Sequence, residues 1–110
     1  MERRQETKIV KVALKNAGHT NCRVKHGSGT AWGWLDIYSP IRHHPECSCT
    51  RHSYGVQETS PVCSSHWRKK HDALLDTTLN ATGRYGEYNG NVNVHLDFDS
   101  DQYDALPVVD

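Results

Sequence analysis

The sequence predicts an α+β domain with a small antiparallel sheet, two helices on one face of that sheet and a zinc-stabilised loop insertion. Three observations predict this class: two segments with apolar residues at helical spacing, β-prone segments between and after them, and a proline-punctuated segment rich in Cys and His. With 110 residues the chain has room for one hydrophobic core. We therefore expect a single domain over residues 1–110, with the insertion at about 39–66 and an acidic tail at about 99–110.

The two helices are expected at about residues 6–17 and 64–80. In the first, apolar residues such as Val10 and Leu14 recur on one face and lysines line the other. Ser64 or Ser65 can cap the second helix, and Gly83 can end it.

The strands are expected at residues 22–26, 31–38 and 91–98. A glycine loop joins the first two as a hairpin, and an Asn89-Gly90 turn pairs the last with a short strand at 85–88. Apolar side chains on both faces of the 31–38 strand predict cover on both sides, at least in part. The tail is expected to be loose at its end.

Cys47, Cys49, Cys63 and His66, spaced C-x-C-x13-C-x2-H, predict a bound Zn²⁺. Residues 63 and 66 are one helical turn apart and can point at one ion, and the C-x-C pair can supply two more sulfurs. A metal also explains how a long segment without regular structure fits in a compact domain. The other histidines near these cysteines are alternatives for the fourth ligand: His43, His44, His71 and, best placed in sequence, His52.

Three Cys and one His close a tetrahedron, which is the structural rather than the catalytic pattern. Nucleobase deaminases carry H-x-E and then P-C-x-x-C. His44-Pro45-Glu46 matches the first motif, but Cys63 with His66 matches the second poorly, and only 14 residues separate Glu46 from Pro61. A zinc-dependent hydrolase or deaminase is therefore the third hypothesis.

Charge divides the chain: residues 1–71 hold 12 Lys/Arg against 5 Asp/Glu, and residues 72–110 hold 1 against 8. The candidate binding residues are basic and aromatic: Arg23, Lys25, Trp32, Trp34, Arg68, Lys69 and Lys70. The alternatives are that the two tryptophans pack in the core and that the basic run is a solvated face. The acidic tail can shield the basic surface or mimic nucleic acid toward a basic partner.

The opening Ile9–Lys15, then Val24-Lys25 and the strand from Trp32 to Ile37, resembles the start of a large polyvalent protein-associated domain. The resemblance covers about 30 residues, and Trp34-Leu35-Asp36 departs from that family's usual strand ending. It implies a phage or mobile-element protein that contacts host machinery or protects invading DNA, and it carries over no catalytic residue.

Our leading hypothesis is a non-enzymatic, zinc-stabilised small binding protein, phage or mobile-element encoded, that binds or inhibits a host protein or nucleoprotein complex. The second is a direct nucleic-acid-binding zinc protein. No apolar run reaches ~18–20 residues, so we expect no membrane span. The first ten residues lack an apolar signal core, so we expect a cytoplasmic protein, where thiols favour metal over disulfides.

Overall fold

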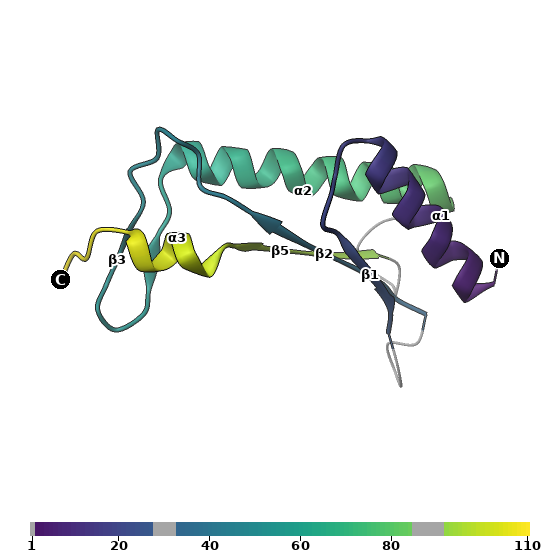
Figure 1. The fold of residues 1–110 in the computed structure, drawn as a ribbon, viewed down its shortest axis with the longest axis horizontal. Coiled ribbons are helices and arrows are strands. Elements are labelled where there is room, and N and C mark those ends of the chain that lie inside the picture. The colour runs from purple at the N-terminus through teal and green to yellow at the C-terminus, as the bar shows by residue number, and fades with distance from the viewer. Residues whose placement is uncertain (1, 28–32, 85–91) are drawn as a thin grey trace.

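The described part of the chain, residues 2–27, 33–84 and 92–110, forms three helices and two small sheets in the computed structural model. The predicted α+β class is confirmed, and helices α1 and α2 lie on one side of the main sheet (Figure 1). The elements are, in order, α1 (Arg3–Asn16), β1 (Arg23–His26), β2 (Leu35–Ile41), β3 (Thr50–Arg51), β4 (Gln57–Glu58), α2 (Pro61–Thr82), β5 (Val92–Phe98) and α3 (Ser100–Ala105).

The main sheet is mixed and has the order β1-β2-β5. β1 pairs antiparallel with β2, as expected, but β5 runs parallel to β2, with Ile37 opposite Val94. The prediction of a wholly antiparallel sheet is therefore wrong. The connection from β2 to β5 passes through α2, which returns the chain to the end of the sheet where β2 begins. The expected strand at 85–88 and the Asn89-Gly90 turn lie outside the described residues.

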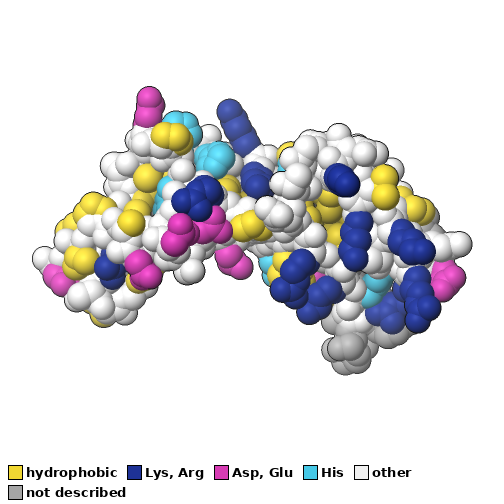
Figure 2. All heavy atoms as spheres, in the orientation of Figure 1, with side chains coloured by type: hydrophobic (Ala, Val, Ile, Leu, Met, Phe, Trp, Pro, Cys, Tyr) yellow, Lys and Arg dark blue, Asp and Glu magenta, His cyan; other side chains and the backbone are white. Residues whose placement is uncertain are grey.

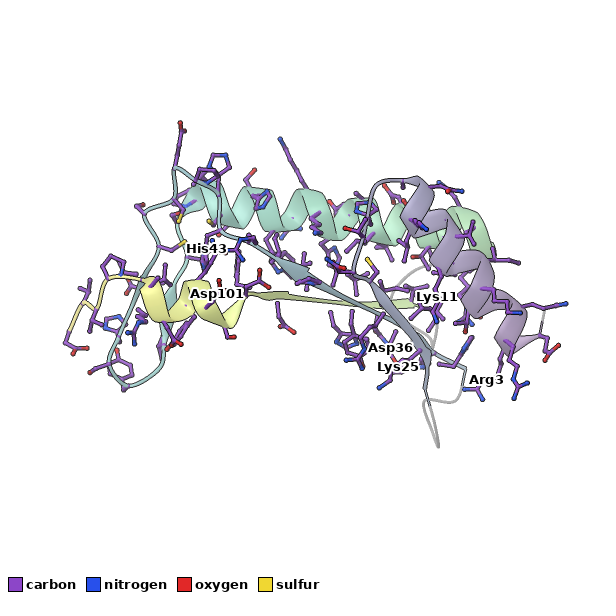
Figure 3. All side chains as sticks on the ribbon, in the orientation of Figure 1. Arg3, Lys11, Lys25, Asp36, His43 and Asp101 are labelled. Atoms are coloured by element: carbon purple, nitrogen blue, oxygen red, sulfur yellow. The ribbon has the colours of Figure 1, made fainter. Side chains whose placement is uncertain are left out.

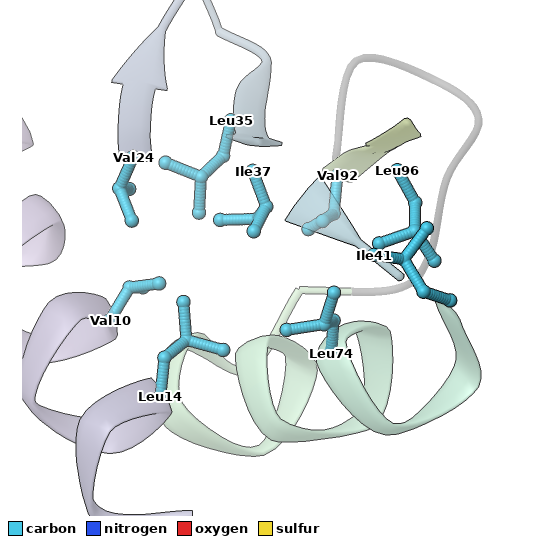
Figure 4. Close-up of a cluster of buried hydrophobic side chains, with 9 residues drawn as sticks. All are labelled: Val10, Leu14, Val24, Leu35, Ile37, Ile41, Leu74, Val92 and Leu96. Atoms are coloured by element: carbon cyan, nitrogen blue, oxygen red, sulfur yellow. The ribbon is translucent and has the colours of Figure 1, made fainter. Parts of the chain in front are cut away.

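The core lies between the two long helices and the inner face of the main sheet (Figure 4). Val10 and Leu14 of α1 and Leu74 of α2 meet Leu35 and Ile37 of β2, and all five are almost completely buried. On the outer face of β2, Asp36 and Tyr38 are half-buried, and Trp34, just before the strand, is exposed. The outer face of this central strand is therefore covered only in part, which agrees with the expectation of at least partial cover.

Helix α2 begins earlier than the sequence predicts. Ser60 is its N-cap residue and Pro61 its first residue, a position where the missing N–H of proline costs nothing. Cys63 therefore lies in the first turn of the helix. Gly83, with φ of 75°, ends the helix in the left-handed conformation that glycine adopts readily, as predicted.

Glu6 of α1 ties the two long helices to the β1–β2 hairpin. Arg84, just beyond α2, donates from Nε to Glu6 Oε2 at 3.0 Å and from Nη2 to Oε1 at 2.6 Å, and it also donates to the Gly33 carbonyl. His26 Nε2 lies 2.8 Å from the same Oε1. The Arg84 guanidinium, opposed by burial and assisted by His26, holds the pKa of Glu6 below its ordinary value.

The molecule is elongated, with extents of 50 × 30 × 21 Å. Its radius of gyration is 15.9 Å, against ~13 Å for a compact domain of this length. We call residues 42–60 and 99–110 the distal lobe, because they lie at the end of the molecule away from α1 and the N-terminus (Figure 1). No helix in the described ranges has the length and apolar content needed to cross a membrane.

The C-terminal tail is an ordered part of the distal lobe. After α3, the Pro107 carbonyl accepts from Arg51 N at 2.9 Å and Val109 N donates to the Arg51 carbonyl at 2.8 Å. This short parallel bridge joins the tail to β3, which itself pairs with β4. The expectation of a loose tail end is therefore wrong, because backbone pairing across more than 50 residues of sequence fixes it.

Candidate metal centre

His43, Cys47 and Cys49 of the distal lobe converge with Cys63 at the start of α2, and the four residues could hold a metal ion. One donor atom from each lies within 4.8 Å of the others, and Cys63 Sγ is 3.4 Å from His43 Nδ1. A tetrahedral zinc ion with standard bond lengths places its sulfur and nitrogen ligands ~3.5–3.8 Å apart. The group is therefore close to the spacing that one such ion requires.

Two segments bring these residues together. His43 lies two residues after the end of β2, and the loop that follows it carries Cys47 and Cys49. Cys63 enters from the first turn of α2, and Figure 3 shows His43 near the start of that helix. The three predicted cysteines are therefore all present in the group.

The histidine in the group is His43, whereas the sequence favoured His66. Although His66 is one turn after Cys63, its Nε2 lies 3.1 Å from the Arg42 carbonyl, and the residue is only half-buried. His52, the best-placed alternative by sequence, instead stacks on Tyr54 and lies 3.2 Å from Glu58 Oε1. One signal for His43 was available, because it continues the alternation of buried residues along β2 two positions after Ile41.

The surroundings of His43 fix its ring. Its backbone N donates to Gln102 Oε1 at 2.7 Å, and the ring stacks on Phe98 with centroids 4.2 Å apart. Its Nε2 is buried without a hydrogen-bond partner among the described residues, so Nδ1 is the nitrogen that faces the thiols. Burial lowers the pKa of His43, and a neutral imidazole is the form that binds a metal.

Backbone amides point at two of the sulfurs. Ser60 N donates to Cys49 Sγ at 3.2 Å and His44 N donates to Cys63 Sγ at 3.3 Å. Burial opposes ionisation of Cys49, but the Ser60 hydroxyl and amide and the neighbouring thiols hold its pKa below the ordinary value. Burial raises the pKa of Cys63 to about 11, against the opposing hydrogen bond from His44. A cation among these sulfurs favours their thiolate forms.

The metal group is also the buried centre of the distal lobe. In residues 42–60 and 99–110, all of them described, the only buried residues are His43, Cys49 and Ser60. The lobe thus buries no aliphatic or aromatic side chain completely. Its ion pairs, such as Arg42 with Asp99 at 3.0 Å, are largely exposed and contribute little. Without a bound ion the lobe is held together mainly by hydrogen bonds, such as those between Arg51 and the tail, because it has no apolar core.

The deaminase-like motif does not coincide with this group. His44 is outside the set, and its Nδ1 accepts a hydrogen bond from Glu46 N at 3.1 Å. Glu46 itself is exposed. With four protein ligands in place, a tetrahedral ion has no open position for a water molecule.

The candidate binding residues fall on different surfaces. Arg23 and Lys25 lie on β1 at the outer face of the sheet, where both approach the Tyr38 ring at 5.5 Å. Trp34 is 40% exposed, so the expectation that it packs in the core is wrong, and Trp32 lies outside the described residues. The basic run is on α2, which lies on the helical side of the sheet, and comprises Arg68, Lys69 and Lys70 (Figure 1).

The acidic tail meets part of the expected basic surface. Arg42 pairs with Asp99 and, at 3.4 Å, with Asp101, and Arg51 donates to two carbonyls of the α3 region. Figure 3 shows Asp101 on α3, below His43.

No protein-family model, curated protein or solved structure matches this chain. The resemblance of its first third to large polyvalent protein-associated domains stays a prediction.

Proposed function

We propose that this chain is a non-enzymatic binding protein whose distal lobe is organised by one Zn²⁺ held by His43, Cys47, Cys49 and Cys63. The position of this group as the buried centre of a lobe without a hydrophobic core carries the proposal. Three thiolates and one neutral imidazole are typical ligands of structural zinc, and thiolates favour it over harder cations.

The metal has a structural role in this proposal. Four protein ligands complete its coordination, so zinc fixes the loop 42–60 against α2 and supplies neither a bound water nor an open site. Because a structural zinc site contributes its binding free energy to folding, the distal lobe depends on the ion.

The protein acts by occupying a surface of a host protein or nucleoprotein complex, and it is encoded by a phage or another mobile element. The resemblance of the first third to domains found in such proteins supports this part of the proposal. Direct nucleic-acid binding is the second candidate function, and the Lys and Arg side chains that gather over α1 and β1 favour it (Figure 2).

Metal analysis of the purified protein tests the zinc site. We expect one zinc per chain in the parent, loss of zinc and a lower melting temperature in Cys63→Ser, and no loss in the control Cys22→Ser. Cys22 is half-buried beside the main core and outside the metal group, so the control changes a thiol without changing a ligand. The zinc proposal fails if no metal copurifies and Cys63→Ser melts like the parent.

The genes adjacent to this one test the proposed origin. Phage structural or transfer genes in the neighbourhood support a mobile-element protein, whereas a metabolic operon counts against it.

A further inference from the structure

Helix α1 carries a row of four exposed cations along one side. Arg4, Lys8, Lys11 and Lys15 are spaced by four, three and four residues, and all four are exposed. At 100° per residue they lie within about 60° of one another around the helix axis, over a length of ~16 Å. The opposite side of α1 is buried in the core, so this row faces solvent as one linear array.

The row continues onto the neighbouring strand. Arg23 and Lys25 of β1 are exposed, and Figure 2 shows Lys and Arg side chains gathered over α1 and β1 on a single face. We call the six residues Arg4, Lys8, Lys11, Lys15, Arg23 and Lys25 the basic surface. On the face drawn in Figure 2, most Asp and Glu side chains lie instead toward the distal lobe, away from α1.

The cations of the α1 row are not neutralised locally. Among the described residues none of the four forms an ion pair, and the acidic residue within α1, Glu6, is already paired with Arg84 and His26. Lys11 and Lys15 also lie at a hollow of about 270 Å³ whose wall includes the apolar side chains of Leu14 and Cys22. Thr20 and Asn21 on the same wall can donate hydrogen bonds to phosphate oxygens. The array is therefore available to a polyanion.

The geometry favours duplex over single-stranded nucleic acid. Single-strand binders stack bases on free aromatic faces. Here the Tyr38 ring is stacked on His95, with centroids 4.4 Å apart, and approached by the cations of Arg23 and Lys25. Trp34 is 40% exposed, but one partly exposed ring does not provide a row of aromatic faces for successive bases. A duplex offers one charge per ~1.7 Å of axis, which suits a straight row of cations. A membrane surface is a poorer fit, because the exposed side of α1 lacks a broad apolar face. Of the large apolar side chains of this helix only Ile9 and Val12 are exposed, whereas Val10 and Leu14 are buried in the core.

We infer that the basic surface binds the phosphate backbone of duplex nucleic acid without reading its sequence. The inference deepens the binding role proposed above and gives it a surface: α1 and β1, rather than the basic run on α2. Four phosphate contacts from the α1 row predict a slope of about −3.6 for log K against log salt, or roughly a hundredfold loss of affinity from 50 to 200 mM.

The test is fluorescence anisotropy of the zinc-loaded full chain with a labelled duplex of random sequence over that salt range. The test variant combines Lys8→Gln, Lys11→Gln and Lys15→Gln, and we expect the slope to become shallower by about 2.7. The control combines Arg68→Gln, Lys69→Gln and Lys70→Gln, which removes the same charge from α2, and we expect its slope to change by less than one. Zinc content and melting temperature confirm that each variant is folded.

Equal effects of the two variants would mean that only net charge matters and would overturn the inference, as would a larger effect of the α2 variant. Tighter binding to the single strand, or binding to anionic vesicles without binding to the duplex, overturns it as well. Because zinc content is measured on the same samples, a chain that keeps its zinc but binds no duplex refutes this surface and leaves the metal proposal standing.

Discussion

Replacing His43 by glutamine tests the central assignment of the metal group. Glutamine is similar in size but is a poor zinc ligand, so His43→Gln removes the imidazole while leaving only a small cavity. The matched control, His66→Gln, makes the same change at the histidine that the sequence favoured. The two histidines differ in position: His43 Nδ1 is 3.4 Å from Cys63 Sγ, whereas His66 Nε2 faces the Arg42 carbonyl at 3.1 Å.

The expected effect follows from the binding energy of structural zinc. Apparent values of about 10–16 kcal/mol shared among four ligands give about 3 kcal/mol per ligand, or roughly a hundredfold loss of affinity for His43→Gln. Loss of the ring stacked on Phe98 costs about 1 kcal/mol more in stability of the lobe. In His66→Gln the loss is one hydrogen bond of a half-buried side chain, about 1 kcal/mol or less, with no change in zinc affinity.

Competition with a chelator of known zinc affinity measures both variants. The parent and His66→Gln are expected to lose zinc at the same chelator concentration, and His43→Gln at a concentration about a hundred times lower. The reverse order would show that His66 is the ligand and that the geometry around His43 does not describe the metal-bound protein.

Three other changes test the fold. Leu74→Ala, at a completely buried position of the core, is expected to lower the free energy of unfolding by about 2–5 kcal/mol in denaturant titrations; a loss under 1 kcal/mol would contradict the packing. Glu6→Gln breaks the buried pair with Arg84 and is expected to cost about 3 kcal/mol at pH 7. Because the pKa of Glu6 is lowered from 4.5, this contribution is complete above pH 4.5 and is lost as the pH falls through the lower folded value. The difference in free energy of unfolding between the parent and Glu6→Gln should therefore shrink at pH 3. A difference that does not change with pH would refute the stabilising role of the ionised Glu6 carboxylate. Arg42→Gln removes an exposed pair with Asp99 and is expected to cost under about 1 kcal/mol, so a large loss would show that the tail is held mainly by charge.

The sequence by itself determined the α+β class, the inner faces of both long helices and the three cysteines of the metal group. These are local properties of the sequence. Helical periodicity shows which side of a segment is apolar, and three cysteines close to the start of one helix mark a candidate metal site whatever the order and direction of the strands. The end of α2 at Gly83 was predictable for the same reason, because glycine readily adopts the left-handed backbone conformation that ends a helix.

Only the tertiary structure decided which histidine joins the cysteines, which way β5 runs and where the tail lies. The spacing placed His66 one helical turn from Cys63, but the direction of its side chain depends on how α2 packs near the end of β2. There His66 Nε2 lies within hydrogen-bond distance of the Arg42 carbonyl. His43 lies 20 residues from Cys63 in sequence and reaches it because β2 and α2 meet at the distal lobe. The pairing of β5 with β2 and of Val108 with Arg51 likewise joins distant segments, and such contacts leave no periodic signal in the sequence.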